Sequence, residues 1–102
     1  MTQHAKQLVS DLEAEYDQEE GFLGLLRTGH FDSLARDRFL RLLQSIDLGT
    51  GGSIDRRVVA LLWYVPLFMQ WQERRLDADE RKALQAAANR VTSELERILG
   101  VP

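Results

Sequence analysis

Six carboxylates crowd into the first 20 residues of the chain, where Lys6 is the only lysine or arginine. They are Asp11, Glu13, Glu15, Asp17, Glu19 and Glu20. Three like-charged pairs at i,i+4 each destabilise a helix by about 0.2–0.5 kcal/mol, and acids near a helix C-terminus oppose its dipole. Two such local conflicts together indicate function or compensation from elsewhere in the fold. The cluster therefore predicts a surface that docks a basic partner. The alternatives are a solvated face, or one neutralised internally by Arg27, Arg36, Arg38 or Arg41.

The other polar motifs do not assemble into a catalytic or metal site. His4 and His30 lack a companion at ligand spacing, and the chain has no cysteine. His30, in the segment TGHFD, is expected in a turn or at an interface. The glycine-rich loop at 47–53 lacks the lysine and the preceding strand of a phosphate-binding loop. We therefore expect no enzymatic activity, no cofactor and no metal.

The aromatic residues Trp63, Tyr64, Phe68 and Trp71 could line a ligand pocket, but on a buried helix they are expected mainly to form core. Trp71 stands between Gln70 and Gln72 near the expected helix end. It is therefore expected to reach the surface and anchor a partner, as tryptophans at interfaces do.

The element that must organise these residues is the apolar run at 58–69, VVALLWYVPLFM. A helix that is apolar all round must be covered all round, and this run is too short to span a bilayer. It predicts a central buried helix over 54–75, kinked at Pro66, which removes one hydrogen bond. Two helices that break at Val65 are the alternative. Ser53 is the expected N-cap.

The rest of the chain also has helical periodicity, and no segment alternates with period two. Helices are expected at 2–19, at 22–27 followed by Gly29, after Asp32 or Ser33 as N-cap, and from Asp77 to Gly100. Asp77 and Glu80 have the spacing of a capping box. The prediction is an all-α single domain, residues 1–102, with about five helices around the Pro-kinked one.

Composition sets further limits. The hydrophobic fraction of 44% is ordinary for a globular domain, and the net charge of −3 argues against a general nucleic-acid binder. Residues 2–6 are polar and no signal-like apolar segment follows them, so a cytoplasmic location is expected, with no membrane contact.

The segments GFLGLLRTGHFD (21–32) and IDRRVVALLWYVPLFMQWQER (54–74) resemble small helical bacterial immunity proteins of contact-dependent inhibition and polymorphic toxin systems. This resemblance covers about a third of the chain. It implies a monomeric cytoplasmic protein that binds the C-terminal domain of a cognate toxin 1:1 and blocks its active site or substrate channel. If that toxin is a nuclease, the six carboxylates could mimic phosphates, with His30 and Trp71 as further contacts.

Two other functions stay open. The heavy apolar content could serve a self-associating or scaffold protein, which sedimentation would reveal. The arginines of the third and fourth helices could serve a small regulatory nucleic-acid binder, although the acidic N-terminal segment opposes that role.

Overall fold

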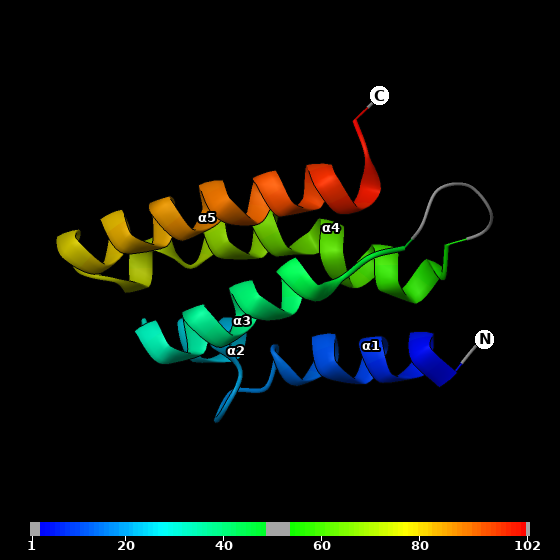
Figure 1. Ribbon diagram of the computed structural model, residues 1–102. Coiled ribbons are helices and arrows are strands. Elements are labelled where there is room, and N and C mark those ends of the chain that lie inside the picture. The colour runs from blue at the N-terminus through cyan, green and yellow to red at the C-terminus, as the bar shows by residue number, and fades with distance from the viewer. Residues whose placement is uncertain (1–2, 49–53, 102) are drawn as a thin grey trace.

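The computed structural model describes residues 3–48 and 54–101. Within these ranges the chain forms five α-helices and one 3₁₀ turn, with no strand, which confirms the all-α prediction (Figure 1). The helices are α1 (Gln3–Ala14), α2 (Phe22–Arg27), α3 (Ser33–Ser45), α4 (Arg56–Trp71) and α5 (Ala78–Leu99); the 3₁₀ turn η1 is Glu73–Arg75.

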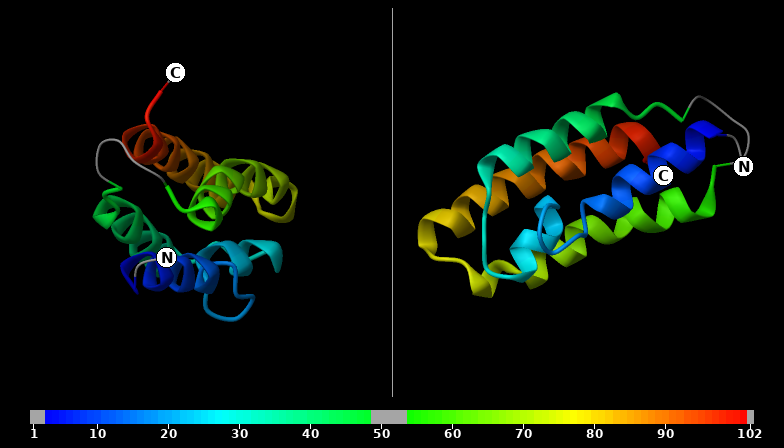
Figure 2. Two further views of the ribbon diagram at one scale, coloured as in Figure 1. Left: turned by 90° about the vertical axis from the view of Figure 1, so that its right-hand side faces the viewer. Right: turned by 90° about the horizontal axis from the view of Figure 1, so that it is seen from below.

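The four longer helices run along the length of the molecule, which measures 43 × 29 × 19 Å (Figures 1 and 2). α4 packs against α1 and α2 on one side and against α5 on the other, and α3 packs on α5 and α2. η1 reverses the chain, so α4 and α5 are antiparallel neighbours (Figure 1).

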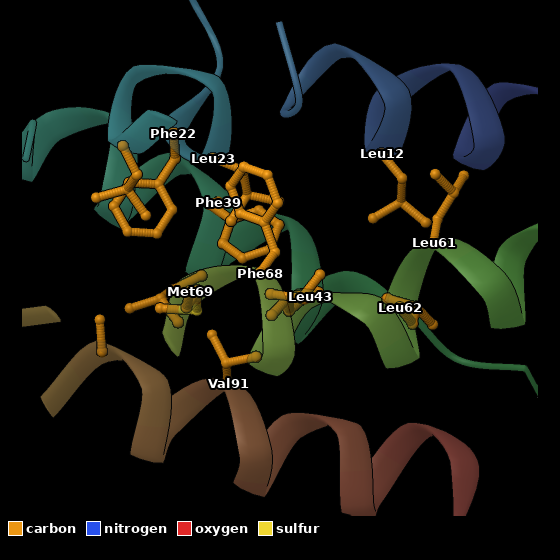
Figure 3. Packing of buried hydrophobic residues seen from close by; sticks show 14 of the residues in the cluster. Leu12, Phe22, Leu23, Phe39, Leu43, Leu61, Leu62, Phe68, Met69 and Val91 are labelled. Carbon is orange, nitrogen blue, oxygen red and sulfur yellow. The ribbon is translucent and has the colours of Figure 1, made fainter. Parts of the chain in front are cut away.

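α4 supplies the middle of the core, as Figure 3 shows. Its buried side chains are Val58, Leu61, Leu62, Val65, Phe68 and Met69. They meet Leu12 from α1, Phe22 and Leu23 from α2 and Val91 from α5, all of which are almost fully buried. The 58–69 run therefore forms the centre of the fold, as predicted.

The structure excludes one of the two predictions for Pro66. α4 passes through Pro66 as one helix, so the alternative of two helices is wrong. The predicted range 54–75 is too long, because α4 begins after Asp55, whose side chain accepts hydrogen bonds from the backbone N–H groups of Arg57 and Val58. Ser53, the predicted N-cap, lies outside the described residues. Satisfying these first N–H groups is the usual task of an N-cap, and Asp55 performs it.

The prediction of a first helix over 2–19 is wrong at its C-terminal end, since α1 ends at Ala14. The carbonyl of Glu15 accepts hydrogen bonds from Leu23 and Gly24 at the start of α2. In a longer helix the backbone N–H of Glu19 would donate to the carbonyl of Glu15, but here it donates to the Asp17 carboxylate. This rearrangement is consistent with the like-charged pairs, which weaken any longer helix.

The other helix ends follow their local signals. Gly29 has φ +87° and follows Thr28, the C-cap of α2. Asp32 caps α3, and Asp77 forms a complete capping box with Glu80. Carbonyl groups at the C-terminal end of α3 accept hydrogen bonds from a residue that is distant in the sequence. Arg97 of α5 donates hydrogen bonds to the carbonyls of Leu43 and Ile46, both at 2.9 Å.

Candidate interaction surface

One face of α4 is uncovered. Trp63 is 52% exposed, Leu67 37% and Trp71 56%, and these three residues are spaced by four, so they form one line along the helix. The prediction that this helix is buried on every side is therefore wrong. In the described part of the chain α4 packs against α1, α2, α5 and η1, and these neighbours leave Trp63, Leu67 and Trp71 partly uncovered.

Tyr64 holds the two tryptophans in place. Its ring meets Trp63 edge to face at a centroid distance of 5.9 Å and Trp71 edge to face at 5.6 Å. It also packs on Phe68 of the core, at a centroid distance of 6.3 Å. Such edge-to-face contacts are favourable beyond the area they bury. We call Trp63, Tyr64, Leu67 and Trp71 the aromatic strip. It is a partly exposed, largely apolar surface.

A groove of about 410 Å³ runs beside the aromatic strip, between α4 and the residues at the end of α1. Its walls include Trp63 and Tyr64, with Glu13 and Arg57 forming an exposed ion pair at 3.6 Å. Tyr16 forms its floor and donates a hydrogen bond to the carbonyl of Leu61 at 2.9 Å. Burial raises the pKa of Tyr16 to about 12; the nearby Tyr64 adds to this rise, while Arg57 opposes it. The phenol therefore stays neutral and fixes the turn after α1 to α4.

Glu15 does not belong to an exposed acidic surface. Its side chain is buried and receives two hydrogen bonds from Arg38, at 2.9 and 3.2 Å, and a third from the backbone N–H of Phe22. Arg38 also donates to the carbonyl of Glu20 at 2.8 Å. The hydrogen bond to Glu15 raises the pKa of Arg38 above its already high ordinary value. The alternative that an arginine neutralises the acidic residues internally is therefore confirmed for Glu15.

The other five carboxylates are divided among three places. Asp11 is half-buried beside Leu42 of α3 and accepts a hydrogen bond from Gln7, whereas Glu13 lies on the α4 side of the same helix. The turn after α1 holds the remaining exposed acids, Asp17, Glu19 and Glu20. Glu20 lines one groove together with Asp11 and Glu15, beside Arg38, whereas Glu13 lines the groove next to α4. A docking role stays a prediction for the exposed acids Glu13, Asp17, Glu19 and Glu20.

His30 is exposed in the turn between α2 and α3, as predicted for a turn residue. The preceding Gly29 lies close to the backbone of Arg75 in η1, which places this turn near the end of α4 that carries Trp71. The side chain of His4 lies outside the described part of the chain. Among the residues that the structure describes, no group of three or more histidine or carboxylate side chains could hold a metal ion. Within the described residues, no helix has both the length and the apolar content that a bilayer span requires.

Comparison of the chain with protein-family models, with curated proteins and with solved structures finds no match. The candidate surface therefore rests on the geometry of this chain alone.

Sequence reasoning identified Trp71 as a surface residue and missed Trp63 and Leu67. A signal for them was present, because Arg56 and Gln70 stand seven residues before and after Trp63. Residues seven apart share a helix face, so polar residues at both ends mark that face as exposed.

Proposed function

We propose that this chain is a non-catalytic protein-binding module, and that its contact face is the aromatic strip of α4. The observation that carries the proposal is the pair of half-exposed tryptophans fixed by Tyr64. Tryptophan and tyrosine are enriched among the few residues that supply most of the affinity at protein interfaces. Trp63, Leu67 and Trp71 together expose roughly 300 Å² of side chain, if a whole tryptophan is taken as about 250 Å². Apolar patches of about this size on small proteins are often functional.

The biological role that we propose is that of an immunity protein, which binds the C-terminal domain of a cognate toxin in the cytoplasm. Support for this role comes from the resemblance of segments 21–32 and 54–74 to such proteins, and the second segment includes the whole aromatic strip. A nuclease toxin needs a basic surface to hold phosphates. The exposed carboxylates of Glu13, Asp17, Glu19 and Glu20 would then attract that surface and speed the encounter, while the aromatic strip supplies the lasting contact.

The first test is protection from a toxin. The C-terminal domain of a toxin encoded immediately beside this chain should arrest growth when it is expressed alone, and co-expression of this chain should restore growth. The proposed role is wrong if no such toxin domain is neutralised.

The second test separates the contact face from the rest of the surface. Trp63→Ala and Trp71→Ala should each weaken binding to the toxin domain by about 30-fold or more, the effect expected of a central tryptophan. Leu34→Ala is the matched control, because Leu34 is 79% exposed but lies on α3. Equal affinities for all three variants would remove the aromatic strip from the interface.

A third variant tests the carboxylates. Replacing Glu13, Asp17 and Glu19 by lysine should slow association and weaken its dependence on salt, with a smaller effect on dissociation. Unchanged association kinetics would show that these acids do not steer the partner.

A further inference from the structure

The exposed residues of the aromatic strip are arranged symmetrically about Leu67. Trp63 precedes Leu67 by four residues and Trp71 follows it by four, so all three lie on one helix face. If two α4 helices pair antiparallel about a two-fold axis at Leu67, each Trp63 meets the Trp71 of the other copy. Leu67 then meets its own counterpart. A surface that is complementary to itself in this way is what a closed two-fold dimer requires.

The charge distribution permits this pairing. The residues at i±3 and i±4 around Leu67 are Trp63, Tyr64, Gln70 and Trp71, and none of them is charged. The groove on the α5 side of the strip is likewise lined by uncharged Gln70, Gln85 and Asn89, with Glu73 at one end. Two copies therefore meet at the axis without like charges opposed, in the pattern of an apolar centre with a polar rim.

The exposed area of the aromatic strip is less than half of what a stable dimer buries on each partner. The strip provides roughly 300 Å² of exposed side chain on each copy, and a stable interface buries about 800 Å² on each partner. α4 has 16 residues and is therefore about 24 Å long, so the helix backbone, Gln70 and the groove walls lie within reach of the second copy. The strip can supply the apolar core of a small interface.

We propose that in the absence of another partner the chain forms a homodimer through antiparallel pairing of α4, with Leu67 on the two-fold axis. This dimer covers the same face that the proposed function assigns to the toxin domain. The toxin domain would then have to displace the second copy, and this regulatory step rests on the proposed function. The dimer itself does not, and it is tested on the chain alone.

The absence of cysteine from the chain makes disulfide trapping a direct test. Leu67→Cys should form a covalent dimer under mild oxidation at micromolar concentration, because a residue on the axis meets its own copy at bonding distance. Leu34→Cys is the matched control on α3 and should remain largely monomeric. Trp63→Cys and Trp71→Cys should each cross-link poorly alone and should cross-link with each other when mixed. If Leu67→Cys cross-links no faster than Leu34→Cys, the proposed dimer is wrong.

Sedimentation of the unmodified chain provides an independent measurement. The chain should behave as a reversible dimer at micromolar concentration. Leu67→Glu, which places two like charges on the axis, should raise the dissociation constant by roughly a hundredfold or more. Leu34→Glu should leave it unchanged. A wild-type chain that is monomeric throughout overturns the dimer but not the toxin-binding proposal, which is judged by growth protection. A chain that forms the dimer but gives no growth protection overturns the toxin-binding proposal and supports the dimer.

Discussion

Gly24 is a position at which a single added methyl group should disturb the fold. It lies inside α2, and in an ordinary helix interior a change from glycine to alanine is stabilising by about 0.5–1 kcal/mol. Here a Cβ atom would lie 1.8 Å from the carbonyl oxygen of Asp17 and 2.1 Å from its carbonyl carbon. Both are backbone atoms, so the turn after α1 would have to move by about 1 Å or more, since a packed interior has no spare volume.

The free-energy change can be worked out from these contacts. Overpacking of this kind costs about 1–3 kcal/mol. The hydrogen bonds from Leu23 and Gly24 to the Glu15 carbonyl, at 2.9 and 3.1 Å, would also weaken, at about 1 kcal/mol each. After the helix-propensity gain is subtracted, Gly24→Ala should lower the free energy of unfolding by about 2–4 kcal/mol.

Urea denaturation followed by circular dichroism measures this change. Gly100→Ala is the control, because Gly100 has φ +83° but a Cβ there would meet nothing within 4 Å. Its φ of +83° and ψ of 167° lie in a region almost restricted to glycine, so this variant should lose about 1–3 kcal/mol through backbone strain alone, with no steric contact. A Gly24→Ala variant as stable as the wild type would mean that α2 does not pack on the turn in this way.

Three further substitutions probe the core and the groove. Arg38→Met leaves the buried Glu15 carboxylate without its cation and should lower the free energy of unfolding in urea by about 1–3 kcal/mol. The loss is smaller than for a fully buried pair because Arg38 is half-exposed, and an unchanged free energy would refute its structural role. Burial raises the pKa of Tyr16 to about 12, so the unfolded phenol ionises first and stability should fall between pH 10 and 12. Tyr16→Phe should lose the hydrogen bond to Leu61 at neutral pH but show a shallower alkaline decline, and an unchanged slope of melting temperature against pH would contradict this. Pro66→Ala restores an N–H inside an unbroken helix and should raise stability by about 1–3 kcal/mol, whereas a lower melting temperature would indicate that packing of the proline ring outweighs the hydrogen bond.

The sequence predicted those features that depend on a few neighbouring residues. The α2 boundary at Gly29 and the α5 boundary at Asp77 follow from local turn and capping chemistry, and both are confirmed. The end of α1 could not be found in the same way. It depends on the approach of α2 to Glu15 and on Arg38, which stands 23 residues further along the chain.

The candidate surface was predictable only in part for a related reason. An apolar run shows that a helix contributes to the core, but not how many neighbouring helices are available to cover it. Trp71 could be placed at the surface from its polar neighbours, and Arg56 and Gln70 also mark the helix face of Trp63. How far Trp63 and Leu67 are exposed depends on where α1 and α5 stop covering α4. The carboxylates could be sorted into buried and exposed groups only once α3 had placed Arg38.

The hydrogen bonds from Arg97 join the last turn of α5 to the C-terminal end of α3. Arg97 stands 51 residues after Ile46, and its guanidinium donates to the carbonyl of Ile46, the C-cap of α3. It also donates to the Leu43 carbonyl, which accepts a second hydrogen bond from the backbone N–H of Ile46. Removing the last turn of α5 would remove the Arg97 hydrogen bonds and allow α3 to fray from its C-terminus. Faster amide hydrogen exchange near residues 43–46 would then report a deletion made about 50 residues further along the chain.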